Sequence, residues 1–148
     1  MKIKCAILAL ALLQGACAAN PPATRPAPAA DAGDLDLGCI LPGNCLSSLG
    51  NGGSAPLMYA GPPAQAMAVL QVTLKTFPEA TVVRSGPLAL QVIFTTPAGF
   101  RDQVDFRIDP AAQRIDFRSR SLFGLFDFGK NRSRMQEFRT RFDRQARS

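Results

Sequence analysis

The chain has 148 residues, which suits a single domain, and it carries a formal net charge of +6. It contains no histidine, which excludes a Ser-His-Asp triad, a Cys-His pair and any imidazole metal site. Residues 130–148 hold seven Lys/Arg and two Asp/Glu, so this segment alone carries 7 − 2 = +5. Such a cluster is typical either of an anion-binding surface or of a solvated helix face.

The first twenty residues have the layout of an export signal. Two lysines precede an apolar run at residues 6–13, which is too short to span a bilayer. Two cleavage sites fit the small residues that follow. Gly15-Ala16-Cys17 resembles a bacterial lipoprotein box, and cleavage there would remove residues 1–16 and leave a lipidated Cys17. Cleavage after Ala18 would instead release a soluble protein that starts at Ala19.

Residues 17–37 are rich in Ala and Pro and show no apolar periodicity, so we expect a flexible tether. A semi-extended segment of about 17 residues could hold a domain roughly 50 Å from a membrane. We therefore predict an outer-membrane-anchored lipoprotein that faces the periplasm. A soluble periplasmic protein is the alternative.

Cys39 and Cys45 remain after either cleavage and form an even pair in an oxidising compartment. Pro42 and Gly43 between them can turn the chain so that the sulfur atoms meet. Their spacing is not Cys-x-x-Cys, and no strand–helix context surrounds them, so a structural disulfide is favoured over a redox-active pair. Closing this small ring should contribute about 2 kcal/mol to stability.

A helix, four strands and a second helix follow in the sequence. Pro63 suits the first helical position, and apolar residues recur at helical spacing until Pro78. Residues 81–84, 88–95, 103–109 and 114–120 read as strands separated by turn residues. In the last segment Met135, Phe138 and Phe142 share one helical face.

The register of one hairpin can be predicted residue by residue. If residues 110–113 form the loop, Asp109 faces Arg114. Every polar pair that follows then has opposite charges, and every inward pair is apolar, whereas a slip by one residue would set charge against Ile or Phe. The predicted pairs are Ile108 with Ile115, Arg107 with Asp116, Phe106 with Phe117, and Asp105 with Arg118.

The predicted architecture is an α+β domain over residues 38–148. Each strand has one apolar face and each helix has one apolar stripe, so both helices should pack on the same face of a four-stranded antiparallel sheet. The opposite, polar face, which carries Arg107, Asp116, Arg118 and Asp105, is expected to face solvent or a partner.

The start of the last helix presents an electrostatic problem. If Asn131 is the cap, Arg132 and Arg134 occupy the first turn, where cations oppose the helix dipole. Either Asp127 pairs with one of these arginines, or the helix start forms an anion site. In that second case Gly124 and Gly129 would let the backbone approach a ligand.

Three phenylalanines stand in the segment just before this helix: Phe123, Phe126 and Phe128. We expect most of them in the core and one or two in an exposed contact patch.

Two stretches resemble a known family. "GCILPGNCLSS" and "RIDFRSRSLFGLFDFGKNRSR" are similar to the opening and closing motifs of domain of unknown function family 1499 over about residues 38–145. Leu46, Arg120 and Leu122 depart from the family pattern. The resemblance implies an exported or membrane-associated bacterial domain, or an organellar relative, and no established activity. The residues on the closing motif are Arg118, Ser119, Ser121, Gly124, Asp127, Gly129, Asn131, Arg132 and Arg134.

The leading functional hypothesis is a non-catalytic binding or structural module, with no cofactor and no metal. Its partner would be an anionic lipid, a cell-wall polymer or an acidic protein surface, and the lipid on Cys17 would attach it to the membrane. Nucleic acid is excluded because of the export signal. The candidate partner-binding residues are Arg118, Ser119, Ser121, Asp127, Asn131, Arg132 and Arg134.

The alternative is a hydrolase-like enzyme. It would use Asp127 with Arg118 and Arg132 around a phosphate or carboxylate. This hypothesis requires an unpaired Asp127 in an open cleft.

Overall fold

The structure is a computed structural model that describes residues 35–50 and 53–148. The predicted signal peptide, Cys17 and all but the last three residues of the predicted tether lie outside this range. No helix within the described residues is long and apolar enough to cross a membrane.

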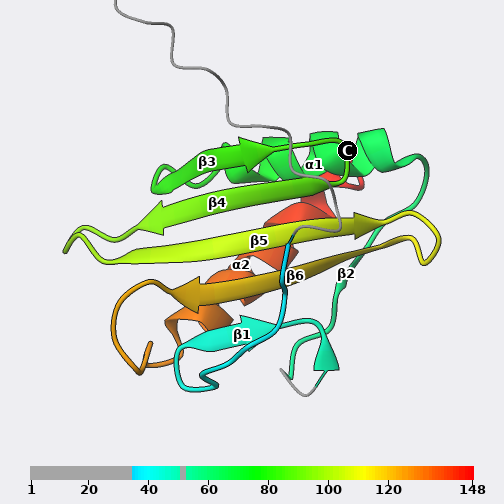
Figure 1. Cartoon of the computed structure of the whole chain (residues 1–148). Coiled ribbons are helices and arrows are strands. Elements are labelled where there is room, and N and C mark those ends of the chain that lie inside the picture. Colours follow the sequence, from blue (N-terminus) through cyan, green and yellow to red (C-terminus); the bar gives the residue numbers. More distant parts are fainter. Residues whose placement is uncertain (1–34, 51–52) are drawn as a thin grey trace, which may run out of the picture.

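The described residues form an antiparallel six-stranded sheet and two helices, which confirms the α+β class (Figure 1). The strands are paired in the order β1-β6-β5-β4-β3, and β2 also pairs with β6. The elements are β1 (Cys45–Ser47), β2 (Leu57–Met58), α1 (Pro63–Leu74), β3 (Ala80–Ser85), β4 (Ala89–Thr95), β5 (Arg101–Asp109), β6 (Arg114–Ser121) and α2 (Lys130–Gln145).

The predicted count of four strands is too low. The four long strands are those predicted, whereas β1 and β2 have only three and two residues. Such segments are shorter than the four to eight residues over which strand alternation can be recognised. β1 pairs with the C-terminal half of β6, and β2 pairs with its first two residues, so these two strands complete the edge of the sheet.

The predicted β5–β6 register is confirmed in full. Asp109 faces Arg114, and the pairing continues without a shift as far as Asp102 and Ser121. The loop is held by the Asp109 carboxylate, which accepts hydrogen bonds from the backbone N–H groups of Ala111 and Ala112 at 3.0 and 3.1 Å.

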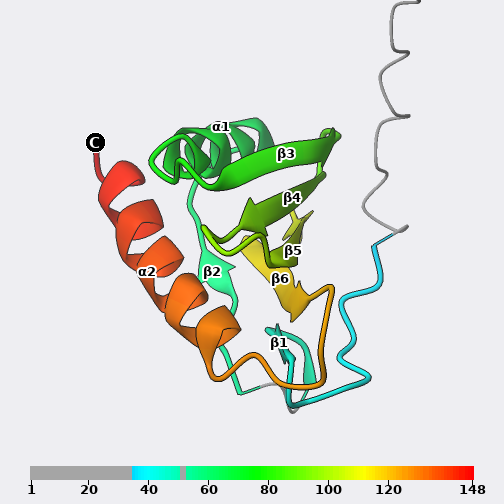
Figure 2. The same ribbon diagram turned by 90° about the vertical axis from the view of Figure 1, so that its left-hand side faces the viewer.

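Both helices pack on one face of the sheet, as predicted (Figure 2). An aromatic cluster fills the space between the layers. The Phe138 ring lies 5.0 Å from that of Phe106 and 5.7 Å from that of Phe77 (centroid to centroid), and Phe77 also contacts Phe94. Phe77 lies beyond the end of α1, yet it is buried as its apolar spacing predicted.

The opposite face of the sheet is not open in the way the sequence suggested. Residues 35–38, which we call the strap, cross β6 on the side away from the helices (Figure 1). Leu35 and Leu37 are buried there, in contact with Ala89. Asp105 and Asp116 on this face are 0% and 1% exposed, so the expected polar surface is largely covered.

Candidate functional site

The predicted site residues are divided between the two faces of β6. Side chains alternate along a strand, so Arg118 projects toward the strap, while Ser119 and Ser121 project toward α2. Arg134 and Asn131 from α2 join the serines, and Arg132 is exposed on the far side of the same helix turn. The structure thus brings four of the seven candidates together, places Asp127 beside them at the Asn131 N–H, and puts Arg118 and Arg132 apart from them.

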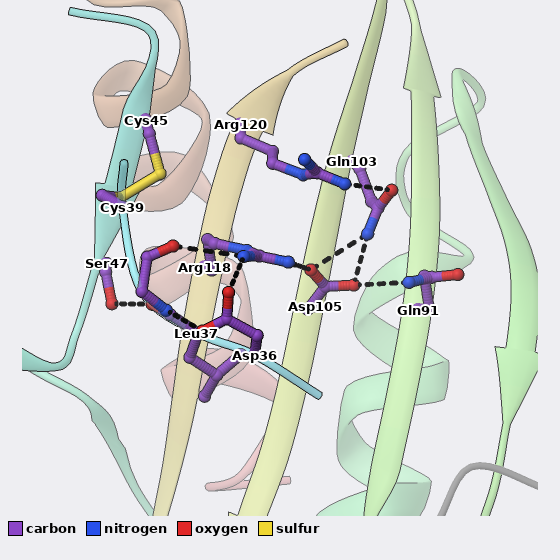
Figure 3. Close-up of polar contacts among 11 residues, drawn as sticks. Asp36, Leu37, Cys39, Cys45, Ser47, Gln91, Gln103, Asp105, Arg118 and Arg120 are labelled. Atoms are coloured by element: carbon purple, nitrogen blue, oxygen red, sulfur yellow. Dashed lines mark hydrogen bonds and ion pairs between the residues drawn. A yellow bond between two sulfur atoms is a disulfide. The ribbon is translucent and has the colours of Figure 1, made fainter. Parts of the chain in front are cut away.

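The outer cluster is built around Arg118, whose guanidinium lies between two carboxylates (Figure 3). Its Nη2 and Nε donate to Asp105 Oδ2 at 2.8 and 3.2 Å. Its Nη1 donates to Asp36 Oδ2 at 3.2 Å and to the Gly38 carbonyl at 3.1 Å. The arginine therefore fastens the strap to the sheet, and its charge is neutralised within the protein.

Asp105 is saturated by further contacts. Its Oδ1 accepts from the side-chain amides of Gln91 and Gln103 at 2.8 and 2.9 Å (Figure 3). The Gln103 carbonyl oxygen in turn accepts from Arg120 at 3.3 Å. A buried carboxylate with this many donors has its hydrogen-bonding capacity satisfied within the protein. The contacts of Arg118 and Asp105 therefore have a structural role, and the two charges pair with each other.

One contact of the strap predicts a pH dependence. The Gly38 N–H and, second, the Arg118 guanidinium hold the pKa of the Asp36 carboxyl below its ordinary value of 3.8. A lowered pKa in the folded state stabilises above the unfolded value, and the benefit disappears as the pH falls through the folded value. We expect the difference in unfolding free energy between the wild type and Asp36→Ala to be constant well above pH 3.8 and to shrink as the pH falls from there through the lower pKa of the folded state. Urea unfolding at several pH values measures it, and a difference that persists at the lowest pH contradicts it.

The inner cluster is built around Arg134 and Asp102, both of whose side chains are 5% exposed. Arg134 Nη2 donates to Asp102 Oδ2, and Nη1 donates to Asn131 Oδ1 at 3.1 Å. Ser119 donates to the same Asn131 oxygen at 2.6 Å, and Ser121 donates to Asp102 Oδ1 at 2.6 Å. Every charge in this cluster has an internal counter-charge.

Asn131 is not the cap of α2. The capping position is Gly129, with φ of 79°, and the Asn131 amide is buried, donating to the Asn44 carbonyl at 2.9 Å. Asp127 satisfies the helix start instead. Its carboxylate accepts from the Gly129 and Asn131 backbone N–H groups at 3.0 and 2.8 Å. This negative charge at the helix N-terminus offsets the cations of the first turn.

The hydrolase hypothesis gains no support from this arrangement. It requires an unpaired Asp127, and here that carboxylate caps α2. Arg118 is engaged with the strap on the other face of β6, and Arg132 donates to the Gly53 carbonyl at 3.3 Å. Across residues 35–50 and 53–148, no three His, Cys, Asp or Glu side chains come together in a way that could hold a metal ion.

The expectation that most of the loop phenylalanines are buried is wrong. Phe123, Phe126 and Phe128 are 77%, 69% and 99% exposed. They belong to a larger set of exposed apolar side chains, which we call the apolar end. Its members are Ile40, Leu41, Phe100, Leu122, Phe123, Leu125, Phe126 and Phe128.

The sheet register explains why these residues meet. Ser121 pairs with Asp102, and Arg120 pairs with Cys45, so the β4–β5 turn, the β6–α2 loop and the disulfide loop all lie at one end of the sheet (Figures 1 and 2). Between the β4–β5 turn and the β6–α2 loop is a hollow of about 410 Å³, lined by several of the phenylalanines together with Arg101 and Lys130. The sequence contains a pattern that is compatible with this surface. The run at residues 122–128 is apolar without strand or helix periodicity.

Cys39 and Cys45 form a disulfide, as predicted, at the border of the apolar end. The ring that it closes contains Ile40 and Leu41, which are 89% and 47% exposed. Gly43 in the same ring accepts a hydrogen bond from the Asp127 N–H at 3.1 Å. The disulfide loop and the β6–α2 loop are therefore physically joined.

Comparison with known protein families matches residues 16–142 to the family described as Protein of unknown function (DUF1499). The match includes both motifs that carried the resemblance, and it begins before the first described residue. A search of curated proteins found no match. The family match covers more than half of the chain, and the chain therefore belongs to the DUF1499 family, whose function is unknown.

Proposed function

We propose that this chain is a non-catalytic binding module of the bacterial envelope and that its partner is anionic. The observation that carries the proposal is the apolar end. Eight large apolar side chains are exposed there beside exposed Arg101 and Lys130. Exposed apolar surface of this kind is typical of an interaction site, and cations at its border favour an anionic partner.

The proposal moves the anion-binding role away from part of the predicted set. Arg118 and Arg134 are neutralised by Asp105, Asp36 and Asp102 inside the protein, so they act as structural residues. The cations that remain accessible near the apolar end are Arg101, Lys130 and Arg132, with Arg120 half-buried. Of the predicted set, Arg132 keeps its proposed role.

The envelope location rests on the sequence. The export signal and the lipoprotein box at Cys17 predict it, and the disulfide suits an oxidising compartment. A lipid anchor at Cys17 would keep the apolar end within reach of a membrane or of the cell wall.

The test uses the mature chain from Ala19, which has neither the signal segment nor the anchor cysteine. We expect it to co-sediment with anionic vesicles or with isolated cell wall, to ignore neutral vesicles, and to be released as salt rises. Arg101→Gln with Lys130→Gln should reduce retention several-fold. The matched control is Arg144→Gln with Arg147→Gln, which removes the same charge from exposed positions at the C-terminal end of α2. Equal retention on every surface contradicts the proposal.

A further inference from the structure

We infer that the anionic partner is the surface of a phospholipid bilayer and that the loop at residues 122–128 enters it. This inference rests on the function proposed above and names the partner.

The loop exposes aromatic side chains that contribute little to the fold. Phe128 is 99% exposed, and its φ is 52°, a left-handed conformation that bulky residues rarely adopt. Phe123 is 77% exposed. A side chain that is neither buried nor suited to its backbone conformation does not stabilise the fold. We therefore expect it to contribute to binding a partner outside the chain.

The loop keeps several of its polar backbone groups turned inward. The Gly124 carbonyl accepts from the Asn44 side chain at 2.6 Å, and the Leu122 N–H donates to the Arg101 carbonyl at 2.9 Å. The Asp127 N–H donates to the Gly43 carbonyl at 3.1 Å. Backbone groups without partners are costly in an apolar phase, so a loop anchored in this way can present its apolar side chains to lipid at low cost.

The cations stand behind the apolar tip. Arg101 is the first residue of β5, Lys130 is the first residue of α2, and Arg120 lies within β6, whereas the apolar side chains belong to the loops beyond these elements. In a bilayer, the apolar side chains at the tip would contact the acyl chains, and the cations behind them would lie at the level of the anionic phosphates.

The carboxylates that line the hollow do not oppose such a surface. Asp102 is paired with Arg134 and accepts from Ser121, and Asp127 caps α2. The exposed charges that line the hollow, Arg101 and Lys130, are positive, and this complementarity selects an anionic bilayer.

The chain contains no tryptophan, so a single Trp can report insertion. We expect Phe128→Trp in the mature chain from Ala19 to shift its emission to the blue with vesicles that contain phosphatidylglycerol. Lipids brominated on the acyl chain should quench it. The matched control is Met58→Trp. Met58 is 61% exposed and pairs with Arg114 at the opposite end of β6, so its emission should not change.

A second variant tests the energetics without a probe. Phe123→Ser with Phe128→Asn removes two apolar side chains, and Asn tolerates the left-handed conformation, so folding should be preserved. We expect binding to the anionic vesicles to fall at least about tenfold. Val82→Thr with Val83→Thr removes two partly exposed apolar side chains from β3 and should leave binding unchanged.

The outcomes separate the two proposals. Binding to anionic vesicles with an unshifted Trp and no effect of the Phe variants would overturn the inference and keep the proposed function. Binding to cell wall or to an acidic protein, but to no vesicle, would do the same. Absence of binding to every anionic material would overturn both.

Discussion

Arg134→Met is expected to lower the free energy of unfolding by about 3–5 kcal/mol, because it leaves the Asp102 carboxylate buried without its counter-charge. Asp102 is 4% exposed and, among the described residues, would keep only the Ser121 hydroxyl as a side-chain donor. The guanidinium also lies over the Phe94 ring, 4.9 Å from its centroid, and this contact would be lost as well. Chemical denaturation followed by circular dichroism measures the change.

Two comparisons make this prediction specific. Arg132→Met removes an exposed cation from the same helix turn and should change stability by less than about 0.5 kcal/mol. Arg134→Met combined with Asp102→Leu removes both charges and should be less destabilising than Arg134→Met alone. If the double variant is as unstable as the sum of its parts, the buried ion pair is not the reason for the effect.

Arg118→Met is expected to destabilise the protein by about 3 kcal/mol and to release the strap. Asp105 would stay completely buried and lose the cation with which it is paired, keeping the two glutamine amides. The strap would lose the contacts to Asp36 and to the Gly38 carbonyl. Denaturation measures the first effect, and hydrogen exchange at residues 35–50 measures the second.

Arg120→Met is the matched control for this variant. Arg120 also projects to the outer face of β6, but its side chain makes one long hydrogen bond, 3.3 Å, to Gln103. We expect a loss below about 1 kcal/mol and an intact strap. Release of the strap in this control would show that Arg118 is not the residue that holds it.

The parts of the fold that the sequence predicted are those in which local patterns carry the information. Alternation along β5 and β6 specifies a face for each residue, and opposite charges specify the register, so the hairpin is determined by residues that are close in sequence. β1, β2 and the strap contact residues of β6 that lie 56 or more positions later in the chain. Leu57, for example, pairs with Ile115, and Met58 pairs with Arg114. Segments this short have no periodicity of their own.

The arrangement of the candidate residues could not be predicted from the sequence. Arg118 and Ser119 were both candidates for partner binding, and strand alternation sends them to opposite faces of the sheet. Nor could the sequence show that Asp127 rather than Asn131 caps α2, because both residue types suit that task. An aperiodic run such as residues 122–128 fits a buried plug or an exposed patch equally well, and only the three-dimensional structure distinguishes them.

The disulfide has a mechanical consequence. A pull on the chain upstream of the strap would peel residues 35–38 from β6, and it would reach Cys39 after four residues. There the sulfur bridge would carry the load directly to Cys45, the first residue of β1, whose ladder with β6 resists it. The force would pass through the disulfide and not through residues 40–44. Ile40 and Leu41 would therefore keep their positions while the chain upstream of the strap is pulled.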